Sequence, residues 1–368
     1  MAEDRPRGRH IVNARPTGTL RVGLVGYGLA GSVFHAPLIA ATPGMALDTV
    51  VTSSPERAGQ AREEYPGVHV AADADALFER ADGLDLVVVA SPNRTHVALA
   101  ERALRAGLPV VVDKPLAATA TEAEALAALA EERGLLLSAF QNRRWDNDFL
   151  TLRGLLERGE LGEVYRFESR FERWRPKLKG GWRESGDPAD VGGLLYDLGS
   201  HLVDQALTLF GPAATVYAES DARRAVGGAD DDTFIAIVHT GGVRSHLWAS
   251  ATAAQLGPRL RVLGSTAAYV KYGLDPQENA LRAGERPRGG AWGVEPDSAW
   301  GTLGTPEEGR TVPTVDGDYP AYYAAVADAL ASGPGGTPPV TALEAAATLR
   351  VLEAARASAA RGVTVTLA

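Results

Sequence analysis

Short apolar runs separated by helix-like segments dominate the first third of the chain. Such runs occupy residues 20–25, 46–52, 68–71, 84–90, 108–112 and 135–140. The run at 84–90 is apolar almost throughout, as expected of a central parallel strand that is covered on both faces. Strands that alternate with helices predict a doubly wound α/β domain with a parallel sheet.

The second half changes to alternating apolar and polar positions. Residues 164–173 have period-two character, and further strands are expected at 214–220, 233–239, 243–251, 259–263 and 267–272. Consecutive strands without helices between them predict a largely antiparallel sheet in an α+β domain. Such a sheet can leave one of its faces open.

These patterns divide the 368 residues into two domains, a natural arrangement at this length. We expect a mobile tail at 1–18, a parallel-sheet domain at 19–141 and an α+β domain at 142–368. The segment 284–309 is rich in loop-forming residues and is expected to be a mobile lid or a partner arm. Helices are expected at 321–331 and 343–360, packed back on the fold.

A glycine-rich turn follows the first strand and opens a helix-like segment. It reads Gly26-Tyr27-Gly28-Leu29-Ala30-Gly31, the GxGxxG pattern of dinucleotide-binding Rossmann domains in the context that the pattern requires. Gly26 permits the tight turn, Gly28 lets the backbone approach a pyrophosphate, and Gly31 lets the helix pack close to the strand. Backbone N–H groups at the helix N-terminus would bind the phosphates, so all six residues are predicted to contact the cofactor.

The end of the second strand indicates which nicotinamide cofactor is bound. An NAD site has Asp or Glu about 20 residues beyond the glycine motif, where it binds the ribose hydroxyls. Here the strand ends in Thr52-Ser53-Ser54-Pro55-Glu56-Arg57, with no carboxylate at its tip. The hydroxyls of Ser53 and Ser54 and the guanidinium of Arg57 suit the 2′-phosphate of NADP. In the alternative interpretation, Ser-Pro-Glu caps the next helix and Arg57 is solvated.

Two further loops follow predicted strands at the carboxyl edge, where open parallel sheets bind their ligands. The stretch Ser91-Pro92-Asn93-Arg94-Thr95-His96 comes after the fourth strand, and we expect Ser91, Pro92, Asn93 and His96 to contact the cofactor. His96 also suits a solvent-facing position at the start of the next helix. Asp113-Lys114-Pro115 ends the fifth strand, which places a carboxylate and a lysine at the cofactor site.

The chain leaves the parallel sheet through a polar stretch. A helix is expected at 121–133, with Thr121 as its N-cap and Glu124 in the capping-box position. After the sixth strand comes Gln141-Asn142-Arg143-Arg144-Trp145-Asp146. Guanidinium groups donate fixed hydrogen bonds to hydroxyls and an aromatic face packs on a sugar ring, so this stretch suits a polyol site. An interdomain ion-pair cluster is an equally good interpretation of Arg144.

The stretch 192–201 holds the strongest candidates for proton transfer. Asp197 and His201 are four residues apart, so a helix would place both on one face. A carboxylate beside an imidazole favours the imidazolium and fixes the orientation of the ring, as a general base requires. The alternative is a helix-surface pair that contributes a few tenths of a kcal/mol.

Composition narrows the class of protein. A net charge of −9 and a pI near 5.4 argue against nucleic acid or an anionic membrane as a partner. There is no cysteine, and the seven histidines lack ligand spacing, so no metal site is expected. No apolar run approaches the ~20 residues that span a bilayer. Abundant alanine and arginine suggest a GC-rich bacterial genome, and a cytoplasmic bacterial enzyme is expected.

Several of these motifs together resemble one known family. The glycine motif, SPNRTH and the Asp113-Lys114-Pro115 tripeptide look like the glucose-fructose oxidoreductase/inositol dehydrogenase/rhizopine-catabolism family. The stretches GYGLAGSVFHAPLI, QNRRWDNDFLTL and YDLGSHLVDQAL are similar to its NADP-dependent scyllo-inositol dehydrogenase branch. Asp113 stands where Glu is commoner, which is a conservative difference.

The resemblance implies hydride transfer between NADP, rather than NAD, and a secondary alcohol of a cyclitol or sugar. It implies that His201 removes the hydroxyl proton, that Asp197 holds His201, and that Lys114 binds the reacting oxygen, with Asn142 and Arg143 also at the substrate. It further implies a homodimer or homotetramer formed through the open sheet face. A reductase of keto-sugars, anhydrosugars or other carbonyls is one alternative, and a non-catalytic NADP-sensing regulator is another.

Overall fold

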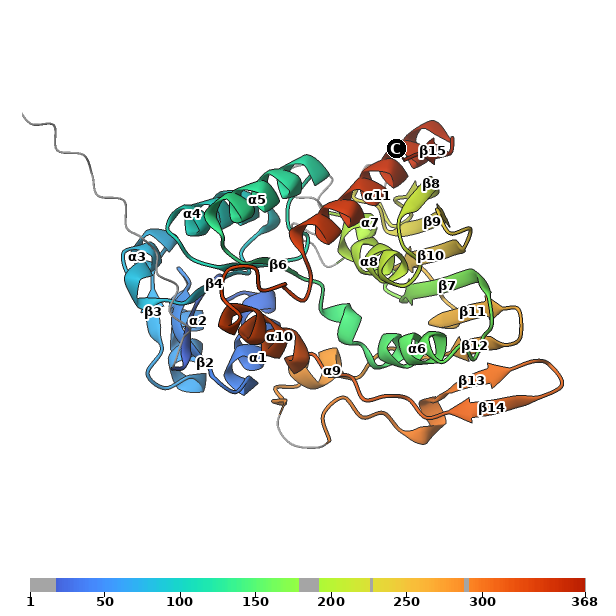
Figure 1. The fold of residues 1–368 in the computed structure, drawn as a ribbon, viewed down its shortest axis with the longest axis horizontal. Helices are drawn as coiled ribbons and strands as arrows, with labels where there is room; N and C mark the ends of the chain where they lie inside the picture. Colours follow the sequence, from blue (N-terminus) through green and yellow to red (C-terminus); the bar gives the residue numbers. More distant parts are fainter. Residues whose placement is uncertain (1–17, 179–191, 226–227, 288–290, 368) are drawn as a thin grey trace, which may run out of the picture.

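The computed structural model describes residues 18–178, 192–225, 228–287 and 291–367. The expected tail thus lies outside the described residues except for its last position. Two sheets with separate helical covers make up the molecule, and the chain crosses from one to the other near residue 141 (Figure 1). None of the helices in the described ranges is long and apolar enough to cross a membrane.

The first sheet has six parallel strands in the order β3-β2-β1-β4-β5-β6. The strand order reverses between β1 and β4, and the glycine turn follows β1 at this switch point, where doubly wound sheets bind ligands. The strands are β1 (Leu20–Val25), β2 (Met45–Val51), β3 (His69–Ala71), β4 (Leu86–Val89), β5 (Val110–Asp113) and β6 (Leu137–Phe140). The helices are α1 (Ala36–Ala41), α2 (Pro55–Glu64), α3 (Ala74–Phe78), α4 (His96–Arg105) and α5 (Ala120–Arg133).

The second sheet has nine strands in the order β14-β13-β12-β11-β7-β10-β9-β8-β15. Every neighbouring pair is antiparallel except β7 and β10, so the predicted largely antiparallel sheet is confirmed. The strands are β7 (Val164–Glu172), β8 (Ala213–Asp221), β9 (Asp232–His239), β10 (Arg244–Ser250), β11 (Leu260–Gly264), β12 (Ala268–Lys271), β13 (Gly301–Gly304), β14 (Gly309–Val312) and β15 (Val365–Thr366). The helices are α6 (Asn147–Glu157), α7 (Leu194–Asp197), α8 (Gly199–Phe210), α9 (Gln277–Arg282), α10 (Pro320–Ala331) and α11 (Ala342–Arg361).

Helices cover one face of the second sheet. Alternate residues of β9 are buried, and α8 and α11 pack on the sheet through β10 and β8 respectively. Helix α11 also packs against α5 and α10 packs against α1, so both C-terminal helices contact the first domain (Figure 1). On the opposite face the rings of Phe234 and Trp248 lie 5.1 Å apart between centroids and stay partly exposed.

The structure adds a strand to one predicted segment and corrects the N-cap of one helix. The segment 284–309 contains β13, which pairs with β12 and β14 and extends the sheet as a hairpin (Figure 1). Glycine-rich strands of this kind lack the apolar alternation by which a strand is predicted. The capping box of α5 is formed by Thr119 and Glu122, because both Thr119 and Thr121 have a Glu three residues on and the helix starts from the first of them.

Candidate active site

A cavity of about 1360 Å³ is lined by residues of both domains. From the first domain come the loops that follow β1, β2, β4 and β5, and from the second come residues next to β7, α7 and α9. The predicted cofactor residues in its wall are Gly26, Tyr27, Gly28, Leu29, Ala30, Ser53, Arg57, Ser91, Pro92, Asn93, Asp113 and Lys114. Most of the loops singled out in the sequence therefore meet at one cavity.

The three glycines have different surroundings that match their expected roles. Gly26 has a φ of +100°, and a Cβ there would lie 2.7 Å from the Ala90 carbonyl oxygen. A Cβ on Gly31 would collide with the carbonyl oxygen of Gly26, because the helix packs closely on the strand. Gly28 faces open space, and the nearest atom to its ideal Cβ is a terminal nitrogen of Arg57 at 3.9 Å. The cradle fits a dinucleotide pyrophosphate, with a guanidinium beside it.

The polar residues after β2 have two different roles: one caps α2 and two line the cavity. The Ser54 hydroxyl caps α2 by accepting a hydrogen bond from the Arg57 backbone N–H at 3.3 Å, and Ser54 does not line the cavity. Ser53 and Arg57 do line the cavity, so the capping interpretation holds for Ser54 while Arg57 is free to face a ligand. Among the described residues, the Arg57 side chain makes no ion pair.

His96 lies behind the cavity wall instead of in it. It is 1% exposed, with Nδ1 2.8 Å from the Pro115 carbonyl oxygen and Nε2 2.9 Å from that of Ser91. Both contacts tie the loop after β4 to the loop after β5. The structure thus gives His96 a positioning role in place of the expected solvent-facing or cofactor-facing one.

Asp113 holds the lysine loop from the end of β5. Its Oδ1 accepts a hydrogen bond from the Lys114 backbone N–H at 2.8 Å, and His35 Nε2 lies 3.8 Å from the same oxygen. Burial raises the pKa of Asp113, but His35, Lys114 and His96 lower it, and the net effect is a pKa below its ordinary value. The carboxylate is therefore ionised and fixes the lysine loop.

Lys114 reaches across the cavity to the second domain. Its Nζ donates to Oδ1 and to the backbone oxygen of Asp197, each at 2.6 Å. Asp197 is the last residue of α7, whose first turn is held by Asp230 accepting from the Leu195 N–H at 2.6 Å. The two domains thus meet at a charged pair in the wall of the cavity.

His201 differs from the expectation in its partner and in its charge. The helical backbone is interrupted at Leu198, between α7 and α8. Asp197 pairs with Lys114. Nδ1 of His201 is buried and has no hydrogen-bond partner among the described residues. Burial lowers the pKa of His201 well below its ordinary value, and Lys114 and three arginines lower it further. The structure thus holds a neutral imidazole in place of the expected imidazolium.

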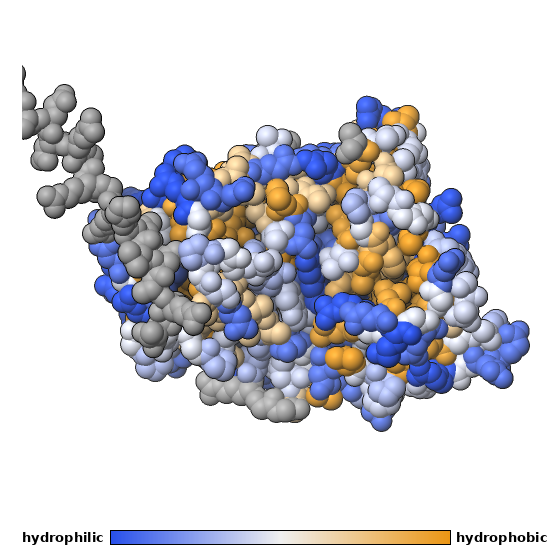
Figure 2. Space-filling view, viewed as in Figure 1, coloured by the Kyte–Doolittle hydropathy of each residue, from blue (hydrophilic) through white to orange (hydrophobic). Residues whose placement is uncertain are grey.

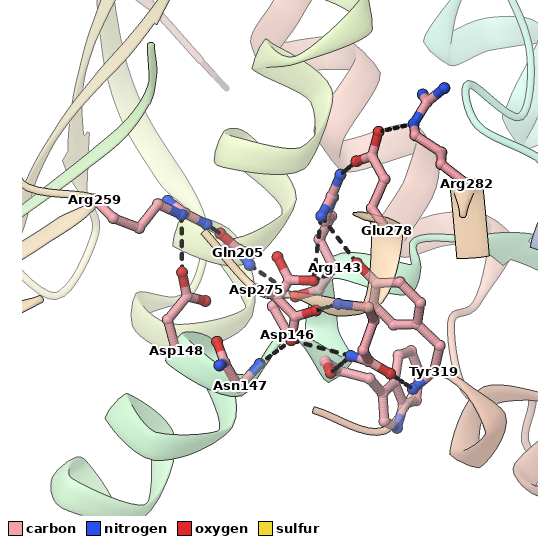
Figure 3. A network of polar contacts seen from close by, with 12 residues as sticks. Arg143, Asp146, Asn147, Asp148, Gln205, Arg259, Asp275, Glu278, Arg282 and Tyr319 are labelled. Carbon is pink, nitrogen blue, oxygen red and sulfur yellow. Dashed lines mark hydrogen bonds and ion pairs between the residues drawn. The ribbon is translucent and has the colours of Figure 1, made fainter. Parts of the chain in front are cut away.

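Arg143 is fixed in the cavity wall by a polar network (Figure 3). Its guanidinium contacts the Glu278 carboxylate and donates to the Tyr319 hydroxyl at 2.9 Å, and that hydroxyl donates to Asp146 at 2.7 Å. Burial raises the pKa of Glu278, but Arg143 and Arg282 lower it to about 2, so the carboxylate is ionised. Asn142 also lines the cavity.

Sequence reasoning missed Glu278 and Tyr319, which hold Arg143 in place. They lie 135 and 176 residues further along the chain, so no local pattern connects them with Arg143. Arg144, in contrast, forms the ion-pair cluster: it donates to Asp204 at 2.7 and 2.9 Å and to Glu344 at 2.8 Å. It does not line the cavity.

Comparisons with known proteins agree with this architecture. Residues 20–141 match a family model described as oxidoreductase family, NAD-binding Rossmann fold, and residues 153–367 match its C-terminal alpha/beta domain. The chain is 46% identical to the oxidoreductase YdgJ of Escherichia coli K12, covering 95% of this chain and 99% of YdgJ. It is 36% identical to the scyllo-inositol 2-dehydrogenase (NADP(+)) IolW of Bacillus subtilis 168, covering 94% of this chain and 95% of IolW.

Solved structures show the same fold. The oxidoreductase YvaA of Bacillus subtilis superposes with a TM-score of 0.89 at 35% identity, covering 96% of this chain and all of that one. An oxidoreductase from Yersinia pestis superposes with a TM-score of 0.87 at 40% identity, covering 96% of this chain and 98% of that one. Fold and site together define a two-domain oxidoreductase with a nicotinamide-dinucleotide-binding Rossmann domain. The chain belongs to the Gfo/Idh/MocA family, as its sequence motifs predict.

Proposed function

We propose that the protein transfers a hydride between NADP and a secondary alcohol of a cyclitol or sugar. The observation that carries the proposal is the meeting of Lys114, Asp197 and His201 in one cavity with the glycine cradle. A proton acceptor and a fixed cation beside a nicotinamide site are what alcohol oxidation requires. The similarity to IolW, which is named as an NADP-dependent scyllo-inositol 2-dehydrogenase, supports the substrate class and the cofactor.

NADP is proposed as the cofactor on the chemistry of the β2 end. Arg57 lines the cavity within reach of Gly28, Ser53 lies beside it, and the strand tip offers no carboxylate to repel a 2′-phosphate. Gly26 to Ala30 would hold the pyrophosphate, and Ser91 to Asn93 would line the path toward Lys114. When bound, the nicotinamide supplies the hydride acceptor for oxidation and the hydride donor for reduction.

The side chains have complementary roles in this proposal. The neutral imidazole of His201 accepts the hydroxyl proton during oxidation and returns it during reduction. The Lys114 ammonium donates to the reacting oxygen and stabilises the negative charge that develops there. Asp197 aims that ammonium through the contact at Oδ1, and Arg143 and Asn142 bind other hydroxyls from the wall.

An absorbance assay for reduced nicotinamide tests the proposal. Wild type and Lys114→Ala are assayed with NADP and with NAD across scyllo-inositol, myo-inositol and a panel of neutral and acidic aldoses. Turnover of a polyol with NADP, lost in Lys114→Ala while NADP binding persists, is the expected result. Measurable NADP binding without turnover of any polyol or, in reverse, of any keto-sugar contradicts the proposal and favours a sensor.

We further infer that the protein is an oligomer formed through the uncovered face of the second sheet. That face carries the Phe234–Trp248 ring pair, with the Arg170 guanidinium 3.9 Å from the Trp248 ring centroid. Figure 2 shows apolar residues on the side of the molecule that Figure 1 assigns to the second domain, where α8 and α11 overlap the sheet in this view. Light scattering should give at least a dimer for wild type and a smaller species for Trp248→Glu, and a monomeric wild type would contradict this assembly.

A further inference from the structure

Three cations line the cavity from one extended segment, residues 173–178, which follows β7. Arg173 N–H donates to the Ser250 oxygen and Arg175 N–H to the Ala251 oxygen, each at 2.8 Å, and Trp174 pairs with Thr252 as an isolated bridge. In an extended chain alternate side chains share a side. Arg173, Arg175 and Lys177 line the cavity; Arg173 is partly buried, whereas Arg175 and Lys177 are exposed, as is Trp174. We call these three cations the basic strip.

Among the residues that the structure describes, the side chains of the basic strip form no ion pair. Within the described ranges, no hydrogen bond or ion pair joins any of these three side chains to another residue. The carboxylates near Arg173 are already engaged, because Asp197 binds Lys114 and Glu278 binds Arg143 and Arg282. Arg170, three positions earlier on β7, pairs with Glu168 and Glu172, so an arginine that forms no ion pair with any described residue is a local exception.

Arg173 lies at the catalytic end of the cavity. It is partly buried, and its charge acts on His201 together with those of Lys114, Arg143 and Arg259. Burial lowers the pKa of Arg173, the charges of Glu278 and Asp197 raise it, and those of Arg175 and Arg143 lower it. Since guanidinium stays charged in proteins, a partly buried arginine without a partner is stabilised when a ligand brings an anion.

We propose that the substrate of this site is an acidic sugar or cyclitol, whose carboxylate or phosphate binds Arg173 of the basic strip. This deepens the proposed function and rests on its site. A neutral polyol offers hydroxyl acceptors to Lys114 and Arg143 but no charge for Arg173. A carboxylate or phosphate suits the planar guanidinium fork and orients the hydroxyl to be oxidised toward His201.

A matched set of ligands tests the charge requirement. D-glucose, D-glucuronate and D-glucose 6-phosphate differ only at C6, and myo-inositol with its monophosphate forms a second set. Calorimetric titration into NADPH-loaded wild type should show the anions binding about 10- to 100-fold more tightly than the neutral parent, as expected for a charge-assisted hydrogen bond. The difference should shrink as salt concentration rises.

Variants locate the effect. Arg173→Gln should remove most of the preference for anions, Arg173→Lys should retain part of it, and Arg133→Gln, exposed on α5, should leave it intact. Thermal unfolding checks that each variant is folded. Equal affinity for neutral and anionic ligands in wild type overturns the proposal. An Arg173→Gln variant that keeps the preference for anions also overturns the proposal. A variant that instead loses affinity for NADP does so too, because the anion bound by Arg173 would then be a phosphate of the cofactor.

The outcomes separate this inference from the proposed function. Anion preference in calorimetry without turnover of any ligand supports the anion-binding role of Arg173 and contradicts the dehydrogenase proposal. Turnover of neutral polyols with no preference for anions supports the dehydrogenase proposal and contradicts the anion-binding role of Arg173.

Discussion

The ammonium of Lys114 lies 2.6 Å from a carboxylate oxygen of Asp197, although the two residues are 83 positions apart. Lys114 follows the last residue of β5 in the parallel-sheet domain, and Asp197 ends α7 in the other domain. The side chains are 15% and 33% exposed, so the pair faces the cavity. The placement of the lysine therefore depends on how the two domains pack.

Asp197→Asn tests whether this pair serves catalysis. The substitution keeps the shape and removes the charge that aims Lys114, so we expect turnover to fall roughly 10- to 100-fold, the effect of one charge-assisted hydrogen bond. The affinity for NADP, measured by fluorescence titration, should not change. Asp316→Asn removes an exposed carboxylate away from the cavity and serves as the control. Unchanged turnover in Asp197→Asn would show that the pair is structural.

The pH dependence of oxidation should report the neutral state of His201. Burial and the surrounding cations hold its pKa well below 6.5, so the imidazole is neutral throughout the neutral pH range. We expect turnover to be flat above pH 6.5 and to fall only as the imidazole takes up a proton at lower pH. Turnover should be about 10²- to 10⁴-fold lower in His201→Ala, and the fall in turnover at low pH should disappear from its pH profile. A rise in rate toward low pH would contradict the base role.

The same residue links stability to pH. Because the folded-state pKa of His201 lies below the unfolded value, the unfolded chain binds the proton first, and the free energy of unfolding declines as pH falls below 6.5. Urea unfolding at pH 7.5 and 5.5 should show a smaller decline for His201→Gln than for wild type. His239, whose pKa burial also lowers, is present in both proteins and cancels in the comparison.

Some of these features were predictable from sequence because they depend on neighbouring residues. The turn from Gly26 to Gly31 is such a feature, since strand, turn and helix are contiguous. The capping box was ambiguous for the same local reason: Thr119 and Thr121 offer equivalent spacing, and in the structure Thr119 is the N-cap. The partner of Lys114 depends on packing between the domains, and a spacing of four residues pointed to His201 as the partner of Asp197 instead.

Arg144 gives a prediction about stability. Its guanidinium joins Asp204 of α8 by two hydrogen bonds, and both side chains are at least 90% buried from solvent. Arg144→Met leaves the Asp204 carboxylate buried without its main partner, so we expect a loss of about 3–5 kcal/mol in the free energy of unfolding. Urea unfolding measures it. The double variant Arg144→Met/Asp204→Leu should recover much of the loss, and if it does not, the cost arises from packing.

Cofactor preference depends on Arg57 in our proposal. Arg57→Glu places a negative charge where the 2′-phosphate of NADP would bind, so the ratio of kcat/KM for NADP over NAD should fall by at least about 100-fold. Activity with NAD should persist or improve, because the glycine cradle and Lys114 are unchanged. Arg62→Glu, on the same helix but outside the cavity, controls for the change in net charge. Equal losses for both cofactors would show that Arg57 supports the fold of this loop and does not select the phosphate.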